Sequence, residues 1–129
     1  MIEKEQVVGL LLGASPSFAE NWERHVSDPT YDEELLYVHL GEFAQHLVDL
    51  MKEGKTEEFQ AIFDVVERLH LEGDPYVREA TTIGLLEAIQ NVAGDNDLAP
   101  EAFYPYLGTE SKHWWERLNE FWSGEGNHV

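Results

Sequence analysis

The chain contains no cysteine and few basic residues. Its 129 residues include 8 Lys and Arg against 26 Asp and Glu, a formal net charge of −18. The missing cysteine excludes disulfides, thiolate metal ligands and thiol redox chemistry. The shortage of bases argues against nucleic-acid binding, which needs clustered Lys and Arg to neutralise phosphates. A protein with this charge is expected to attract basic partners over long range instead.

Long apolar runs are missing as well. No stretch approaches the roughly 20 residues that a membrane-spanning helix needs. The first residues have neither the basic region nor the apolar stretch of a signal peptide. These absences predict a soluble, cytoplasmic protein without a membrane partner. The hydrophobic content of 43%, which includes four Trp, five Tyr and six Phe, is nevertheless enough for a folded core.

Apolar side chains recur with a helical period along most of the chain, and no segment shows the alternation of a strand. Glycines, Ser-Pro and Asp-Pro pairs mark the expected helix ends. We expect helices over residues 3–12, 16–26, 32–53 and 56–72, a fifth from 75 to the turn-rich stretch 94–97, and two more over 100–106 and 110–122. The predicted fold is all-α, with six or seven helices in one domain (1–123) and a flexible tail (124–129).

The fifth helix is the most apolar. Between residues 80 and 89 only Glu87 is charged, which is typical of a central, buried helix. Gly84 in its middle predicts a close crossing with another helix. A buried, unpaired Glu87 would have a raised pKa, as general acids often do. Pairing with Arg78 or Arg68 is the preferred interpretation.

The densest acidic cluster comprises Asp28, Asp32, Glu33 and Glu34, beside Tyr31. Acids in the first turn of a helix each contribute a few tenths of a kcal/mol through the helix dipole. That accounts for one or two of the four, and adjacent like charges repel. The surplus favours a surface that faces a basic partner. Both interpretations stay open.

Asp95 and Asp97 resemble the start of a calcium loop, but the regularly spaced ligands and the closing Glu are missing. We interpret them as a surface loop that could add to the partner-facing charge. Trp114 and Trp115 lie about 100° apart on a helix. Trp114 shares the apolar stripe and is expected in the core, whereas Trp115 at its edge could anchor an interface.

His39, Glu42 and His46 are the residues to weigh as metal ligands, since two imidazoles and a carboxylate can bind zinc. However, seven residues separate the two histidines, about 10 Å along a helix axis. A solvated helix face is therefore the preferred interpretation, and neither a metal nor another cofactor is expected. The motifs of phosphate loops, nucleophile elbows and zinc proteases are also missing, which argues against an enzyme.

Two resemblances add to this interpretation. The segment DPYVREATTIGL at residues 74–85 resembles the second half of a HEAT-type repeat, and with the preceding helix it implies α-α hairpin packing. The wider pattern resembles a family of short bacterial helical proteins of unknown function. That resemblance is carried by LGEFAQHLVDL at 40–50, VERL at 66–69, EGD at 72–74, VR at 77–78 and LLEAIQN at 85–91. It implies a small accessory protein of the kind often encoded beside toxins as an immunity protein.

The sequence therefore predicts an acidic protein-binding protein. The preferred function is that of an immunity protein which neutralises a cognate toxin, basic and of the nuclease type, by covering its active site. The alternative is a HEAT-like scaffold or adaptor with a housekeeping partner, whose acidity serves only solubility. The residues expected to face the partner are Asp28, Tyr31, Asp32, Glu33, Glu34, Asp95, Asp97 and Trp115.

Overall fold

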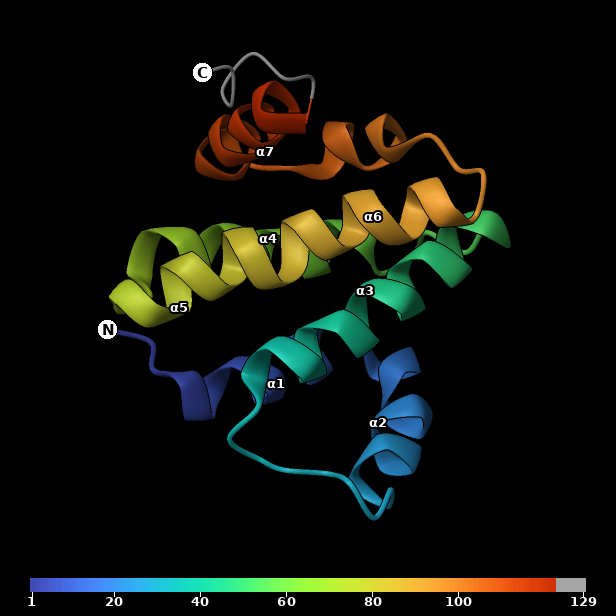
Figure 1. The fold of residues 1–129 in the computed structure, drawn as a ribbon, viewed down its shortest axis with the longest axis vertical. Helices are drawn as coiled ribbons and strands as arrows, with labels where there is room; N and C mark the ends of the chain where they lie inside the picture. Colours follow the sequence, from blue (N-terminus) through green and yellow to red (C-terminus); the bar gives the residue numbers. More distant parts are fainter. Residues whose placement is uncertain (123–129) are drawn as a thin grey trace.

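The computed structural model describes residues 1–122, and in this part of the chain helices are joined by loops, with no β-strand (Figure 1). The prediction of an all-α fold is confirmed, whereas the predicted tail 124–129 lies outside the described residues. The α-helices are α1 (Lys4–Ala14), α2 (Ala19–Val26), α3 (Leu36–Lys52), α4 (Phe59–Glu72), α5 (Pro75–Glu79), α6 (Glu87–Asp95) and α7 (Thr109–Trp122). Two 3₁₀-helices, η1 (Pro16–Phe18) and η3 (Pro100–Tyr106), and a π-helix, η2 (Ala80–Leu86), complete the set.

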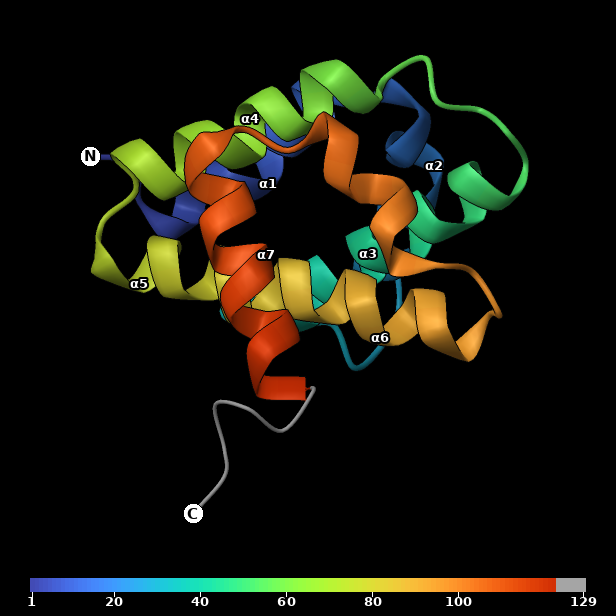
Figure 2. The same cartoon turned by 90° about the horizontal axis from the view of Figure 1, so that it is seen from above.

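The elements α5, η2 and α6 follow one another as a continuous rod, which lies between α7 and α1 in Figure 1 and opposite α4 in Figure 2. Helices α3, α4 and α7 all contact η2. The expectation that the most apolar helix is central is therefore confirmed. Gly84 allows the close crossing with α3, because a Cβ there would lie 3.2 Å from Leu40 Cδ1 and 3.3 Å from Tyr37 Cδ2.

The rod differs from the regular helix that its sequence predicts, because its middle has π-helical hydrogen bonding. The N–H of Glu87 bonds to the carbonyl of Thr82, five residues earlier. One turn before, the hydroxyl of Thr81 donates to the carbonyl of Val77 at 2.7 Å. Such a hydroxyl competes with backbone N–H groups for the carbonyl and disturbs the α-helical pattern. Wide turns of this kind are frequent at functional sites.

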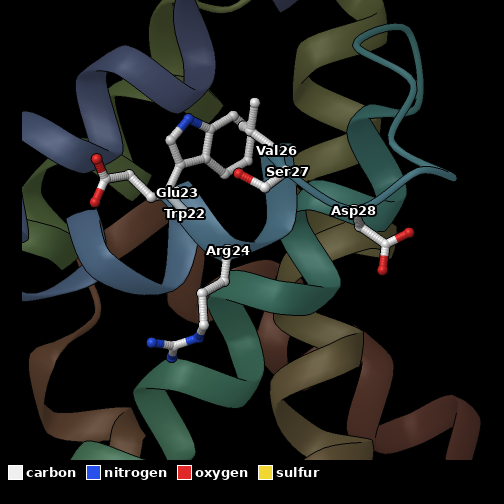
Figure 3. Close-up of a pocket in the computed structure, with 6 residues that line it drawn as sticks. All are labelled: Trp22, Glu23, Arg24, Val26, Ser27 and Asp28. Atoms are coloured by element: carbon white, nitrogen blue, oxygen red, sulfur yellow. The ribbon is translucent and has the colours of Figure 1, made fainter.

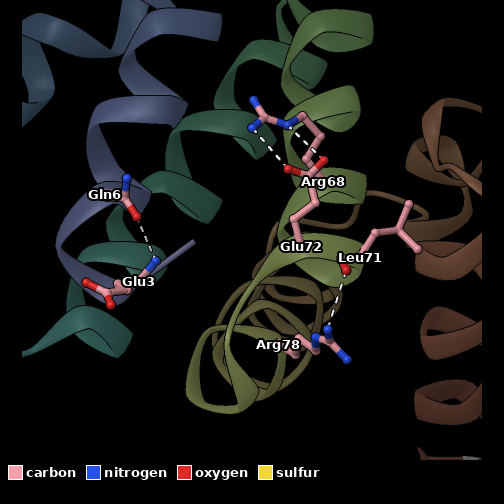
Figure 4. A network of polar contacts seen from close by, with 6 residues as sticks. All are labelled: Glu3, Gln6, Arg68, Leu71, Glu72 and Arg78. Atoms are coloured by element: carbon pink, nitrogen blue, oxygen red, sulfur yellow. Dashed lines mark hydrogen bonds and ion pairs between the residues drawn. The ribbon is translucent and has the colours of Figure 1, made fainter. Parts of the chain in front are cut away.

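The start of the chain is tied to the turn between α4 and α5. Ile2 donates its N–H to Glu72 O at 2.8 Å and accepts the N–H of Asp74 at 2.9 Å. Glu3 begins α1 with a capping box, in which its N–H bonds to Gln6 Oε1 at 2.8 Å (Figure 4). These bonds fix α1 against α4 before the chain enters the rod.

Asp74 is the expected N-cap of α5, since its carboxylate accepts the N–H of Val77 at 2.9 Å. The expected pairing of Glu87 with an arginine is wrong. Arg68 forms an ion pair with Glu72 at 3.3 Å (Figure 4). Arg78 Nε donates to the carbonyl of Gly73 at 2.7 Å. Glu87 itself lies half-buried.

No helix within residues 1–122 is both long enough and apolar enough to cross a membrane.

Candidate protein-binding surface

The acidic cluster lies on the loop that joins α2 to α3, which we call the acidic loop (residues 27–35). Helix α3 begins at Leu36 rather than at residue 32, so none of these acids occupies its first turn. The reason is local: the carboxylate of Asp32 accepts the N–H of Glu34 at 2.9 Å, and this bond competes with helix formation. The helix-dipole interpretation of the cluster is therefore wrong. All four predicted acids of the loop are exposed: Asp28, Asp32, Glu33 and Glu34.

Hydrogen bonds hold the acidic loop in place. Asp28 accepts the N–H of Thr30 at 2.8 Å and its hydroxyl at 2.5 Å. The bonds from the Thr30 hydroxyl and N–H lower the pKa of Asp28, so this carboxyl is ionised at neutral pH. Glu34 forms an ion pair with Lys4 of α1 at 3.2 Å. The loop thus presents its negative charge in a fixed arrangement.

A group of rings lies beneath the acidic loop. Tyr31 stacks on His39 of α3, with 5.3 Å between ring centroids, and meets Trp22 edge-on at 6.1 Å. His25 Nε2 lies 2.9 Å from His39 Nδ1, which links α2 to α3. Tyr31 is half-buried by these contacts. It therefore anchors the loop, and a partner would reach only the exposed part of its ring.

Exposed apolar side chains lie beside these acids. Leu35 and Val38 are 46% and 50% exposed. Together with Asp28, Asp32 and Glu42 they line a cavity of about 150 Å³ between the loop and α3. Apolar groups surrounded by charge are the usual composition of an interface. Neither residue is among those predicted to face the partner. The sequence signal is that both lie outside the apolar positions that α3 buries, such as Leu36, Leu40 and Phe43.

A shallow cleft of about 650 Å³ continues this surface along the last turn of α2 (Figure 3). Trp22 and Val26 lie together in it, whereas the side chains of Arg24 and Asp28 point outward (Figure 3). Arg24 is held by Glu20 at 3.3 Å. Both the cleft and the cavity that adjoin the acidic loop are thus lined by carboxylates together with apolar side chains.

Asp95 and Asp97 lie far from the acidic loop. Both are exposed: Asp95 is the last residue of α6, and Asp97 lies in the segment that follows. Lys52 Nζ bonds to Asn96 Oδ1 at 3.2 Å, which places this segment beside the C-terminal end of α3. The acidic loop precedes the other end of the same 17-residue helix, about 25 Å away (Figure 1). The two acidic groups do not form one continuous patch.

Trp115 is not at the surface. Its side chain is fully buried, and Nε1 donates to Glu101 Oε2 at 3.1 Å, whereas Trp114 is 38% exposed. The expectation of Trp115 as a partner-facing anchor and of Trp114 in the core is therefore wrong. The buried face of α7 is formed by Ser111, Trp115 and Leu118. The predicted apolar stripe is therefore right for Leu118 and wrong for Trp114, because the tertiary contacts cover Trp115 instead.

The three candidate metal ligands, His39, Glu42 and His46, do not point toward a common site. His39 bonds to His25, whereas His46 Nε2 lies 2.9 Å from Ser17 Oγ and its Nδ1 3.2 Å from Asn21. Both imidazoles are buried, which lowers the pKa of each. The expected solvated helix face is therefore wrong for the histidines. Among residues 1–122, no three His, Asp or Glu side chains are grouped so that they could hold a metal ion.

Helices α1–α7 and the acidic loop define a small all-α domain that presents fixed negative charge on its surface. Residues 8–123 match a family described as "Domain of unknown function (DUF7674)", and the chain belongs to this family. The expected resemblance to a family of unknown function is confirmed to this extent. No curated protein and no solved structure matches the chain.

Proposed function

We propose that the chain is an acidic protein-binding protein of the immunity type. It binds a basic protein toxin of the nuclease kind and covers the toxin's active site. The observation that carries the proposal is the acidic loop: it exposes four carboxylates, and hydrogen bonds, an ion pair and ring contacts hold its backbone in place. Because the charges are already in place, binding a cationic surface costs little ordering of the loop.

The overall charge supports the same function. A net charge of −18 attracts a basic partner from a distance, and such steering raises association rates by roughly 10- to 1,000-fold at low salt. Leu35 and Val38 supply apolar area next to the charges, which helps the encountered partner to stay bound. The carboxylates of Asp95 and Asp97 add to the steering field. They would contact the same partner only if it extended along α3.

Co-expression with the open reading frame next to this gene tests the proposal. We expect growth rescue from a toxic neighbour, and a complex that co-purifies at low salt but dissociates as salt rises. A neighbour that is not toxic and forms no complex would overturn the proposal.

Two pairs of variants that remove the same charge test whether the acidic loop is the binding surface. Glu33→Gln with Glu34→Gln should slow association. The loop bonds made by Asp28 and Asp32 remain, and the one loop contact that is lost is the exposed ion pair of Glu34 with Lys4. Glu57→Gln with Asp64→Asn removes the same charge around the start of α4 and is the control. Equal effects of the two pairs would mean that the overall charge acts, not the acidic loop.

The alternative is a HEAT-like scaffold or adaptor. One observation favours it: α4 and the rod are joined by a tight turn, in which Asp74 caps α5 and Arg78 holds the Gly73 carbonyl. In that function the acidity serves only solubility. Affinity for the partner would then depend weakly on salt, which separates the two proposals in one titration.

A further inference from the structure

A second cleft, of about 360 Å³, lies between η2 and α7, and the acidic loop takes no part in it. Ile83 of η2 and Trp114 of α7 line it with half-exposed apolar side chains, 43% and 38% exposed. The buried side chains of His70 and Thr82 lie at its base. No sequence pattern predicts this cleft, because its walls come from segments about 30 residues apart.

The base of the cleft is uncharged and its hydrogen bonds are complete. His70 Nδ1 lies 2.8 Å from Ser111 Oγ, and Nε2 lies 3.1 Å from Thr82 Oγ1. Both ring nitrogens are thus occupied, and the imidazole offers a ligand only carbon surface. The interior of the cleft therefore suits an apolar group or the methylene stem of a longer side chain.

The mouth of the cleft favours a cation. Glu79 and Glu110 both line it, and Glu110 Oε1 holds the indole N–H of Trp114 at 3.2 Å. Arg78 also lines the cleft, but its guanidinium donates to the carbonyl of Leu71 (Figure 4) and to that of Gly73, toward the α4–α5 turn. A planar guanidinium can lie on the face of an indole while it bonds to carboxylates.

We propose that this cleft receives an arginine side chain of a basic partner protein. The methylene stem lies between Ile83 and Trp114, and the guanidinium bonds to Glu79 and Glu110. This inference rests on the proposed function, because the basic partner supplies the arginine. It adds a second, specific contact to the one that the proposed function places at the acidic loop. Long basic side chains commonly bury their stems while the charged end stays near water.

The first test needs no partner. A blocked arginine, Nα-acetyl-arginine methylamide, is titrated into the protein and followed by NMR, with the neutral citrulline analogue as the control. We expect saturable shifts of the Trp114 indole N–H and of backbone amides around Ile83 and Glu110. The affinity for the citrulline analogue should be lower by at least about tenfold. No shifts, or shifts spread over the acidic surface, would overturn the proposal.

Variants localise the effect. Trp114→Ala, or Glu79→Gln with Glu110→Gln, should weaken arginine binding by about tenfold, whereas Glu33→Gln with Glu34→Gln leaves it unchanged. The opposite ranking would place the arginine site at the acidic loop and overturn this inference. Circular dichroism checks that each variant folds.

Co-expression separates this inference from the proposed function. Rescue that is lost with Glu79→Gln and Glu110→Gln supports the cleft as a toxin contact. Rescue that persists in this variant, with an unchanged complex, would refute the cleft but not the immunity function. A non-toxic neighbour without a complex would refute the immunity function and, with it, the cleft's role, even if blocked arginine binds.

Discussion

His70 Nδ1 on α4 lies 2.8 Å from Ser111 Oγ on α7, inside the core. Ser111 donates its hydroxyl to Glu67 Oε1 at 2.8 Å, and His70 Nε2 lies 3.1 Å from the hydroxyl of Thr82. An ionised carboxylate only accepts, so Ser111 donates to Glu67 and accepts from Nδ1–H of His70. Burial keeps this imidazole neutral by lowering its pKa, so Nε2 carries no proton and accepts from the hydroxyl of Thr82. One chain of hydrogen bonds joins α4, η2 and α7.

This arrangement predicts acid sensitivity. Burial lowers the pKa of His70 to about 4, against about 6.5 in the unfolded chain. The unfolded chain therefore takes up the proton first, so the stability that His70 contributes is complete above about pH 6.5 and is lost as the pH falls toward 4. Between about pH 7 and pH 4.5 the loss should be about 2 kcal/mol relative to His70→Gln.

Denaturant titrations at several pH values measure this difference. His113→Gln, at an exposed histidine of α7, is the matched control and should keep the pH dependence of the parent protein. Parallel stability curves for the parent and His70→Gln would contradict the assignment of a neutral, buried imidazole.

Glu67 holds the start of α7 and should be costly to change. Its carboxylate accepts the N–H groups of Glu110 and Ser111, each at 2.9 Å. Although burial opposes ionisation, these bonds keep the pKa of Glu67 below its ordinary value. Glu67→Gln should lower the free energy of unfolding by about 1–3 kcal/mol. Glu72→Gln, which removes an exposed ion pair on the same helix, should cost less than about 1 kcal/mol; similar losses would argue against the cap.

Gly84 should not tolerate the helix-favouring change to Ala. The substitution would gain up to about 1 kcal/mol in helix propensity, but the new Cβ would press on Leu40 and Tyr37. A Cβ at Gly41 of α3 would meet nothing within 4 Å from other parts of the fold, so Gly41→Ala should stabilise the protein. Thermal unfolding is expected to rank Gly41→Ala above the parent and Gly84→Ala at or below it. Equal gains would show that α3 does not approach η2 so closely.

The two adjacent tryptophans should behave in opposite ways. Trp115 is fully buried, so Trp115→Ala should cost about 3–5 kcal/mol of stability. Trp114 is half-exposed, and Trp114→Ala should cost less than about 1 kcal/mol. Chemical denaturation of both variants measures this contrast. A larger loss of stability for Trp114→Ala than for Trp115→Ala would mean that Trp114 is the buried tryptophan, as the sequence predicted.

Local sequence patterns were sufficient to predict much of the fold. The stripe of α3, the N-cap at Asp74 and the burial of the segment around Gly84 all follow from spacing and turn chemistry within one element. The predictions were wrong where a side-chain hydrogen bond competed with the backbone bonds of a helix. Asp32 delays the start of α3 by bonding to Glu34, and Thr81 takes a carbonyl within the rod. Periodicity alone does not reveal which of two hydrogen bonds a side chain will form.

The sequence by itself determined the helical class, the most apolar helix and the negative charge, because these depend on composition and on neighbours three or four residues away. Only the tertiary structure decided which tryptophan of α7 is buried, since that depends on the helices that cover it. It also decided the partners of Glu67, which lie 43 and 44 residues further along the chain. Contacts at that separation form only when the packed core brings the helices together.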